Sequence, residues 1–550
     1  MHIIIPMSGI GKRFIDQGYQ VPKPLIVIDG KPIIEHVVNL FPGETQFTFI
    51  CNEQHLSTTP MRSILEGLSA NANIIAIKPH KKGPVYAVAQ LAATTDLIDD
   101  NEEVIVNYCD FGTYWDYQDF LDHTRSRDAD GAVPAYKGFH PHMLGKTNYA
   151  FMRDQQQWMS AIQEKKPFTD NRMDEYASNG TYYFKHGAYI KKFFNALMAA
   201  DINVNGEYYV SLIYNLMVEA GLKVSIYQIQ HMLQWGTPED VAQYNAWSDY
   251  FNRIMQPQND VTALTESINL IPLAGRGSRF SERGYQQPKP LIDVSGKPMI
   301  IQAAASLPSA NAHRFVCLQQ HLDAYPLSQT LQQYYPDASI IALDRVTEGQ
   351  AMTCDLGLDG VDDDAPLLIA ACDNAMVYDH AQYQRLLADH QVDAIVWTFR
   401  NHPGASQNPQ MYGWVKTESD RAVDVSVKVP ISATPEKDHA IVGTFFFRKT
   451  RYFREALAKM RDDNIRVNNE FYVDSMVGIL AAAGYRVQVF EVDHYICWGT
   501  PDDYETFRYW QSYFHKDTNH GYRIEHDPSV NADRVQALTA EFYDFKQEYR

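Results

Sequence analysis

Cysteine is scarce in this chain: six are found among 550 residues, and no two of them form a CxxC pair. This scarcity argues against a disulfide scaffold or a zinc ribbon and favours a reducing compartment. The chain has no uninterrupted apolar stretch of about 18 residues, the length that spans a bilayer. Its N-terminus, MHIIIPMSG, carries neither a long apolar segment nor a cleavage site. These absences predict a cytoplasmic protein without membrane insertion.

Basic residues are outnumbered, with 48 Lys and Arg against 67 Asp and Glu and a formal net charge of −19. Such an excess of negative charge disfavours binding to nucleic acid or to an anionic membrane. The hydrophobic fraction of 45% and the charged fraction of 21% are ordinary for a globular protein and exclude disorder and coiled coils. An anionic substrate would therefore have to meet cations gathered in a pocket.

What the chain does contain is one sequence written twice. Residues 5–34 and 271–300 are identical at 18 of 30 positions without a gap, where chance would give about two. The correspondence continues down the chain at an offset of 266 and later of 263 residues. We therefore expect two like domains. Their expected extents are 1–256 for the first domain, 257–266 for a linker, 267–515 for the second domain and 516–550 for a C-terminal extension.

Short apolar runs alternate with longer helical patterns in both copies. The segments HIIIP, QFTFIC, NIIAI and EVIVNYC are rich in β-branched residues and predict strands. IIEHVVNLF, GPVYAVAQLAA and YVSLIYNLMVEAG predict helices. This alternation indicates an α/β fold with a mainly parallel sheet, in which ligands bind at the carboxyl ends of the strands.

A glycine loop follows the first strand of each copy, with SGIGKRF at 8–14 and AGRGSRF at 274–280. Glycines let the backbone approach a phosphate, and a following helix offers free N–H groups. Phe14 and Phe280 stand where a dinucleotide fingerprint needs a third glycine, and an arginine follows the lysine where a P-loop needs Ser or Thr. Taken alone, the loop is equally compatible with a tight strand–helix turn.

A PKPL box follows each loop at the same spacing, at 22–25 and 288–291. The flanking prolines hold the lysine backbone extended, and an Arg and a Lys converging on a glycine loop suit a polyphosphate. With this repeated pair of motifs, each half resembles the nucleotidyltransferases that activate sugar 1-phosphates, such as glucose-1-phosphate thymidylyltransferase and heptose- or mannose-1-phosphate guanylyltransferases. The resemblance implies two tandem Rossmann-like (GT-A-like) α/β domains with mainly parallel mixed sheets.

Such enzymes transfer NMP from an NTP to a phosphorylated acceptor and release pyrophosphate. The acceptor phosphate is already a nucleophile, because its second pKa is about 6. The enzyme therefore has to align the substrates, hold Mg²⁺ and neutralise charge. The resemblance implies the catalytic cations Arg13, Lys23, Lys165, Arg279, Lys289 and Lys428, and the nucleotide-binding residues Ser8, Gly9, Gly11, Lys12, Gly83, Ala274, Gly275, Gly277, Ser278 and Gly349.

The strand-end aspartates Asp110 and Asp373 are the expected Mg²⁺ ligands, although either one alone is compatible with a helix cap or a turn. The family usually has a second metal aspartate two residues before the glycine of a late motif, here WGTP. Gln234 and Cys497 occupy that position. We therefore expect one protein carboxylate, completed by phosphate oxygens, in each half.

The acceptor pocket is expected around the motif EKKP at 164–167, whose second copy, VKVP, keeps the lysine and loses the acid. In relatives that acid contacts sugar hydroxyls, so the second half is expected to prefer a different acceptor. Ser211 and Asp474 form a second mismatch between the copies. The expected acceptor-binding residues are Glu164, Gly180, Glu207, Gly443 and Glu470, although the two glycines fit a plain core strand equally well.

Three functions remain open from the sequence. The favoured one is a tandem nucleotidyltransferase that serves bacterial capsule or lipopolysaccharide precursors, with the nucleobase and the acceptor undetermined. The second is that one half only binds a nucleotide sugar and regulates the other, a reading motivated by Gln234 and Cys497. The third is a GT-A glycosyltransferase, which is disfavoured because the strand ends lack a DxD motif. An internal pseudo-dimer is expected, and a homo-oligomer is left open.

Overall fold

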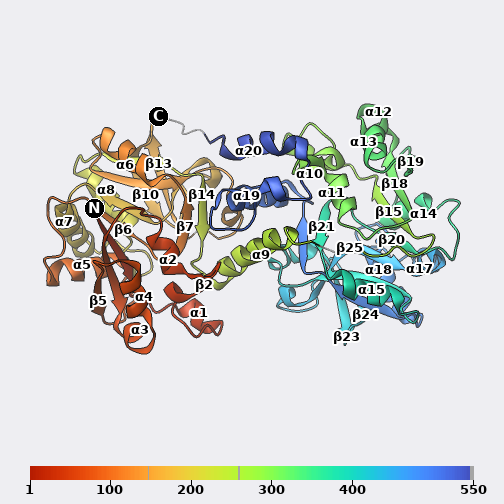
Figure 1. Ribbon diagram of the computed structural model, residues 1–550, viewed down its shortest axis with the longest axis horizontal. Coiled ribbons are helices and arrows are strands. Elements are labelled where there is room, and N and C mark those ends of the chain that lie inside the picture. The colour runs from red at the N-terminus through yellow and green to blue at the C-terminus, as the bar shows by residue number, and fades with distance from the viewer. Residues whose placement is uncertain (147, 258–259, 546–550) are drawn as a thin grey trace. The chain divides into compact units, whose positions relative to one another are not determined.

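The computed structural model describes all residues except 147, 258–259 and 546–550. The chain divides into two compact units, Met1–Ser248 and Asp249–Tyr543. The boundary falls within one helix, α9 (Pro238–Ile254) (Figure 1). The finer limits of domains, linker and extension given above stay predictions. Each unit is a mixed α/β structure, as the alternating pattern predicts.

A ten-stranded sheet forms the core of the first unit. The neighbouring strands β6, β1, β4 and β5 run parallel, whereas β12 is antiparallel to both β6 and β8. The sheet is therefore mixed, and its longest parallel run is built from N-terminal strands. The spatial order is β11 (Tyr176–Ser178), β9 (Ala150–Gln155), β10 (Trp158–Glu164), β13 (Val224–Gln228), β8 (Gly131–Tyr136), β12 (Thr181–Phe184), β6 (Val104–Asn107), β1 (His2–Met7), β4 (Gln46–Asn52) and β5 (Asn73–Ile77).

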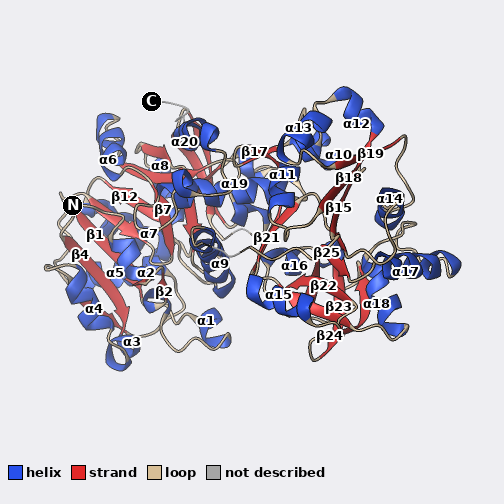
Figure 2. Cartoon of the chain, turned by 45° about the vertical axis from the view of Figure 1, so that its right-hand side comes forward, coloured by secondary structure: helices blue, strands red, loops and turns tan. Residues whose placement is uncertain are grey.

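Helices cover the sheet of the first unit (Figure 2). Three of them, α5, α7 and α8, bury side chains such as Val88, Phe193 and Met217 in one apolar cluster with the central strands. Removing these side chains from water is the main favourable term for folding. The helices are α1 (Lys12–Asp16), α2 (Ile33–Val38), α3 (Glu53–Thr58), α4 (Met61–Leu68), α5 (Pro84–Thr94), α6 (Tyr117–Ser126), α7 (Gly187–Ala199) and α8 (Ile213–Glu219).

The second unit repeats this topology in a nine-stranded sheet. Its first strand, β15, pairs in parallel with β18 and β20, as β1 pairs with β4 and β6. The long strand β25 takes the place of β11 and β12 together. The spatial order is β19 (Ser339–Leu343), β18 (Ala312–Leu318), β15 (Ile268–Leu273), β20 (Leu367–Ile369), β25 (His439–Phe447), β22 (Ala394–Phe399), β26 (Val487–Glu491), β24 (Arg421–Val427) and β23 (Gly413–Glu418).

The helices of the second unit follow the same plan, and α14, α17 and α18 share one buried cluster with the sheet. No helix in the described residues is both long and apolar enough to cross a membrane. The helices are α10 (Ser278–Glu282), α11 (Met299–Ala305), α12 (Gln319–Ala324), α13 (Leu327–Tyr334), α14 (Gln350–Gly357), α15 (His380–Ala388), α16 (Pro403–Gln407), α17 (Thr450–Asp462), α18 (Asp474–Ala482), α19 (Pro501–Lys516) and α20 (Val535–Tyr543).

Short two-stranded ribbons complete each unit and bring the late motif to the strand ends. In the first unit, β14 (His231–Gln234) runs antiparallel to β7 (Phe111–Tyr114) and pairs Gln234 with Phe111. In the second, β27 (His494–Cys497) pairs in the same way with β21 (Asn374–Val377). The position before WGTP therefore lies next to the strand-end aspartate in both units.

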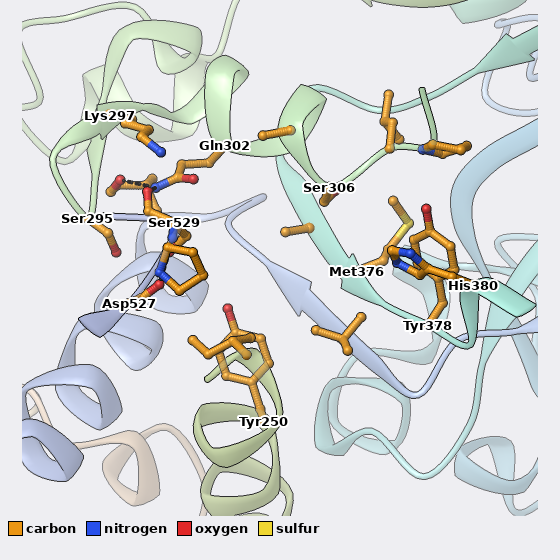
Figure 3. Close-up of a pocket in the computed structure, with 18 of the residues that line it drawn as sticks. Tyr250, Ser295, Lys297, Gln302, Ser306, Met376, Tyr378, His380, Asp527 and Ser529 are labelled. Carbon is orange, nitrogen blue, oxygen red and sulfur yellow. Dashed lines mark hydrogen bonds between the residues drawn. The ribbon is translucent and has the colours of Figure 1, made fainter. Parts of the chain in front are cut away.

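The segment after α19 packs against the second unit. Ile524 is fully buried, and the side-chain amide of Gln302 donates to the carbonyl of Ser529 at 3.0 Å. With the end of α9 and the first turn of α15, this segment borders a cavity of about 440 Å³, lined by Lys297, Tyr378 and other residues (Figure 3). The C-terminal segment is thus part of the second unit's packing, and no sequence motif indicated this cavity.

Candidate active site

The glycine loop turns back on the PKPL lysine in both units. Gly11 and Gly277 precede α1 and α10 with left-handed backbone, at φ of 70° and 63°. Glycine adopts this conformation without strain. A Cβ on Gly11 would lie 4.0 Å from the Cβ of Lys23, and one on Gly277 only 3.2 Å from that of Lys289. The second glycine loop is therefore the tighter of the two.

A lysine–aspartate pair lies at the end of the parallel strands in each unit. The Nζ of Lys23 donates to Oδ2 of Asp110 at 2.7 Å. In the second unit Lys289 donates to Asp373 and also to the carbonyl of Gly499, at 2.9 Å. Burial alone would lower the pKa of Lys23, but its neighbours, chiefly Asp110, outweigh burial and leave the pKa raised. The lysine is therefore protonated, as neutralisation of phosphate charge requires.

The residues before WGTP donate to an aspartate in the first turn of the following helix. Gln234 donates from Nε2 to Oδ1 of Asp240 at 2.8 Å. Cys497 donates from Sγ to Oδ2 of Asp503 at 3.5 Å. Gln234 and Cys497 thus share one structural role despite their different chemistry: each supports the helix-capping carboxylate.

This capping aspartate is a second carboxylate near the site, and the sequence analysis did not single it out. If Gly236 carried a Cβ, that atom would lie 3.4 Å from Oδ2 of Asp110 and 3.8 Å from Oδ2 of Asp240. In the second unit the corresponding distances at Gly499 are 3.6 Å to Asp373 and 3.8 Å to Asp503. Two carboxylates therefore flank the same glycine in each half.

The described residues contain no group of three or more His, Cys, Asp or Glu side chains placed to hold a metal ion. Burial raises the pKa of Asp240, and the nearby charge of Asp110 adds to this effect. Mg²⁺ usually takes one or two protein carboxylates and completes its shell with water and phosphate oxygens. Asp110 with Asp240 close by fits that sparse donor set, and it does not fit a site built from protein ligands alone.

The turn that opens α5 is bonded to the acceptor segment. Gly83 has φ of 82°, and a Cβ there would lie 2.7 Å from the carbonyl oxygen of Tyr208. The backbone N–H of Tyr208 donates to the carbonyl of Lys82 at 2.9 Å, and that of Val85 donates to the carbonyl of Tyr208 at 3.2 Å. Gly349 and Phe471 repeat this arrangement. No side chain larger than hydrogen fits at either glycine.

Both acceptor lysines have left-handed backbone, with φ of 60° at Lys165 and 65° at Lys428. This conformation costs a non-glycine residue about 1 kcal/mol or more and is concentrated at functional sites. Lys165 donates from Nζ to the hydroxyl of Tyr209 at 2.5 Å, and that hydroxyl donates to Glu207. Lys428 instead donates to the carbonyl of Met411 at 2.7 Å.

Glu164 lies at the end of β10 and is 9% exposed. It accepts a hydrogen bond from Ser211 Oγ at 2.6 Å, and burial raises its pKa to about 7. Gly180 packs against the rings of Phe111 and Tyr108, where a Cβ would lie 2.8 Å from Phe111. In the second unit a Cβ on Gly443 would lie 3.2 Å from that of Ala371.

Most of the residues predicted for the first half meet at one cavity of about 740 Å³. An adjoining cavity of about 260 Å³ adds Ser8 and Gly83. His80, Lys81 and Tyr149 also line this space, and the sequence analysis missed them because no motif contains them. The predicted residues that line the larger cavity are Gly9, Gly11, Lys12, Arg13, Lys23, Asp110, Glu164, Lys165 and Glu207.

The residues predicted for the second half occupy the corresponding elements. Ala274 and Gly275 lie in the loop after β15, and Ser278 begins α10. A guanidinium nitrogen of Arg279 lies 3.9 Å from the Met411 sulfur. Glu470 lies beside Tyr472, where it helps to raise the pKa of that phenol to about 12, after the larger effect of burial.

A glycine loop, a buried lysine–aspartate pair and a cavity at the carboxyl ends of parallel strands define a nucleotide-binding α/β protein. The family described as MobA-like NTP transferase domain matches residues 3–171 and 270–466. The chain belongs to this family and contains its domain twice. No curated protein matches the chain.

Several solved structures resemble single copies. The nucleoside-diphosphate-sugar pyrophosphorylase of Vibrio cholerae RC9 is 21% identical, with a TM-score of 0.37, and the match covers 44% of this chain and 99% of that one. For the inositol-1-phosphate CTP transferase of T. maritima these values are 12%, 0.35, 46% and 98%. For the UTP-bound UGPase of Acinetobacter baumannii they are 14%, 0.35, 44% and 91%.

Proposed function

We propose that each half transfers NMP from an NTP to a sugar phosphate or another small phosphorylated acceptor and releases pyrophosphate. The observation that carries this proposal is the protonated lysine held against a strand-end aspartate in both halves, Lys23 with Asp110 and Lys289 with Asp373. A pseudo-enzyme half would have no need to keep this pair, since a partly exposed ion pair adds little to stability.

In the proposed reaction, an oxygen of the acceptor phosphate attacks the α-phosphorus, and the bond from that phosphorus to the β-phosphate oxygen breaks. The backbone of Gly9 and Gly11 holds the triphosphate, while Arg13 and Lys23 neutralise the charge that builds on the leaving pyrophosphate. Lys165 positions the acceptor phosphate. No protein base is required, because the acceptor phosphate is largely ionised near neutral pH.

Asp110, with Asp240 nearby, would hold Mg²⁺, which when bound neutralises the triphosphate and fixes its geometry. Asp373 and Asp503 would do the same in the second half. By the resemblance described above, we place the reaction in the cytoplasm, in the synthesis of bacterial surface-glycan precursors. The nucleotide and the acceptor are then the partners of this chain.

A screen for pyrophosphate release tests the proposed function. CTP, GTP, UTP and dTTP are each combined with a panel of sugar and polyol phosphates, using the wild type, Asp110→Ala and Asp373→Ala. We expect each substitution to abolish turnover of the substrate pair of its own half and to leave the other pair unaffected. Unchanged turnover of every substrate in one variant would contradict catalysis by that half and favour a purely binding role for it.

A further inference from the structure

The floor of the first acceptor cavity is a polar network beside Lys165. Ser211 donates to Glu164 at 2.6 Å, and the hydroxyls of Ser178 and Tyr182 lie 3.3 Å apart. The hydroxyl of Tyr108 accepts a hydrogen bond from the backbone N–H of Val210 at 3.2 Å. Three of these residues, Glu164, Tyr108 and Tyr182, line the cavity itself. This floor offers several groups for hydrogen bonding to an acceptor.

The second half replaces almost all of this network by apolar side chains. At the offset of 263 residues, four of the five positions are held by Val427, Ile441, Phe445 and Ala371. The fifth, opposite Ser211, is Asp474. The second half thus loses its strand carboxylate and gains one at the first residue of α18.

A single small residue makes room for that carboxylate. A Cβ on Gly413 would overlap Oδ2 of Asp474. The counterpart of Gly413 in the first half is Ala150, which lines the acceptor cavity. The Asp474 carboxylate therefore occupies the place of the Ala150 methyl group and becomes part of the corresponding wall in the second half.

The Asp474 carboxylate is available to a ligand. Asp474 is half-buried, and in the described part of the chain the hydrogen-bond partner of its carboxylate is its own backbone N–H. Burial raises its pKa to about 6, and Lys428 opposes that rise. The carboxylate therefore lies close enough to the acceptor lysine to interact with it, and no side chain satisfies it as Ser211 satisfies Glu164.

We propose that Asp474 is the acceptor-recognising carboxylate of the second half. Resting on the proposed function, this assigns that half a phosphorylated acceptor whose carbon skeleton carries hydroxyl groups. The phosphate meets Lys428, and a hydroxyl donates to Asp474. The carboxylate approaches from α18 rather than from β10, and Ala371 leaves open the space that Tyr108 fills in the first half. The two halves therefore select acceptors of different shape.

Titration calorimetry on the full-length chain tests this assignment. Lys165→Ala removes the acceptor lysine of the first half, so that binding reports on the second. In that background we compare Asp474 with Asp474→Asn and with Asp474→Ser, the residue of the first half. The probes are glucose 1-phosphate, mannose 1-phosphate, glycerol 3-phosphate and, as a ligand without carbon-bound hydroxyls, inorganic phosphate. Melting temperatures show whether each variant is folded.

We expect both substitutions to weaken the tightest-binding hydroxylated phosphate about 10- to 100-fold, the usual effect of losing a hydrogen bond to a charged group. Inorganic phosphate should bind equally well or more tightly, because a nearby negative charge is removed. An equal change for all probes would overturn the assignment. So would hydroxylated phosphates that bind no more tightly than inorganic phosphate when Asp474 is present.

The proposed function fails by a different result. If the wild type releases no pyrophosphate with any substrate pair while Asp474 still discriminates hydroxylated phosphates, the transfer reaction is excluded and the acceptor assignment stands. If pyrophosphate release continues and both Asp474 variants keep the acceptor KM of the wild type, the acceptor assignment is excluded and the reaction stands.

Discussion

The two halves share their lysine–aspartate pair and differ around it by groups of touching residues. In the first half Ser8 Oγ and His80 Nε2 lie 3.0 Å apart beside the glycine loop. Their counterparts are Ala274 and Val346, which are both apolar. Removing one partner alone would leave a buried polar group unsatisfied, at a cost of about 1–3 kcal/mol, whereas replacing both is nearly neutral.

The same rule holds in the acceptor pocket, where Glu164 and Ser211 give way to Val427 and Asp474. Differences that come in matched sets preserve packing and hydrogen bonding. Degeneration of an unused domain would instead remove partners one at a time. The comparison therefore indicates two working sites adapted to different ligands, and the experiments below test this from the largest expected effect to the smallest.

The largest effect should come from the shared pair. We expect Lys23→Met and Lys289→Met each to lower kcat of their own half by about 10²- to 10³-fold, because a charge that stabilises the transition state is lost. Pyrophosphate release with the substrate pair of each half measures the effect.

Lys31→Met is the matched control, since Lys31 makes an exposed ion pair with Glu35 outside the cavity. It should leave both activities unchanged. If Lys23→Met slowed both halves equally, the two sites would not be independent and the comparison would fail.

The buried acid of the first half should make stability depend on pH. The pKa of Glu164 is raised by burial from 4.5 to about 7. The folded chain therefore holds this proton more tightly than the unfolded chain. The resulting stabilisation is fully present below pH 4.5 and is lost as the pH rises to about 7, an effect of about 3 kcal/mol.

Glu164→Gln should remove this dependence, because glutamine is neutral at every pH. Urea unfolding of wild type and variant at pH 5 and pH 8 measures it, and the variant should be the more stable protein at pH 8. A variant whose stability falls between pH 5 and pH 8 as steeply as that of the wild type would show that Glu164 is not buried in this way.

The smallest effect should come from the helix caps behind the late motif. Thr500 accepts from the backbone of Asp503 at 3.2 Å and donates to its carboxylate at 2.7 Å, forming a capping box. Thr237 accepts from the backbone of Asp240 at 3.2 Å. We expect Thr500→Ala to cost about 1 kcal/mol and Thr237→Ala to cost less. Chemical denaturation measures both, and a larger cost at Thr237 would reverse the comparison.

Local patterns were enough to predict the α/β fold and the loop that leads into the cavity. Each strand–loop–helix segment lies within about 30 residues, and the repeat doubled the signal at Lys23 and Lys289. The antiparallel half of each sheet was less evident, because strands such as β12 and β25 resemble parallel ones in composition and differ only in their distant partners.

The carboxylates of Asp240 and Asp503 escaped prediction for a related reason. An aspartate in the first turn of a helix is explained by capping alone. Its approach to Asp110 or Asp373 depends on a ribbon pairing between segments more than 100 residues apart. Asp474 was visible only as a mismatch, since the glycine that admits it, Gly413, lies on another element.

The backbone clamp between the α5 turn and Tyr208 has a consequence for exchanging parts between the halves. Because Gly83 and Gly349 each fit against the main chain of their own acceptor segment, the turn and that segment form one module. Grafting only the turn of one half into the other would pair it with a main chain to which it is not fitted. A chimera designed to swap nucleotide choice should therefore carry both pieces, and with them the glutamate of the acceptor segment.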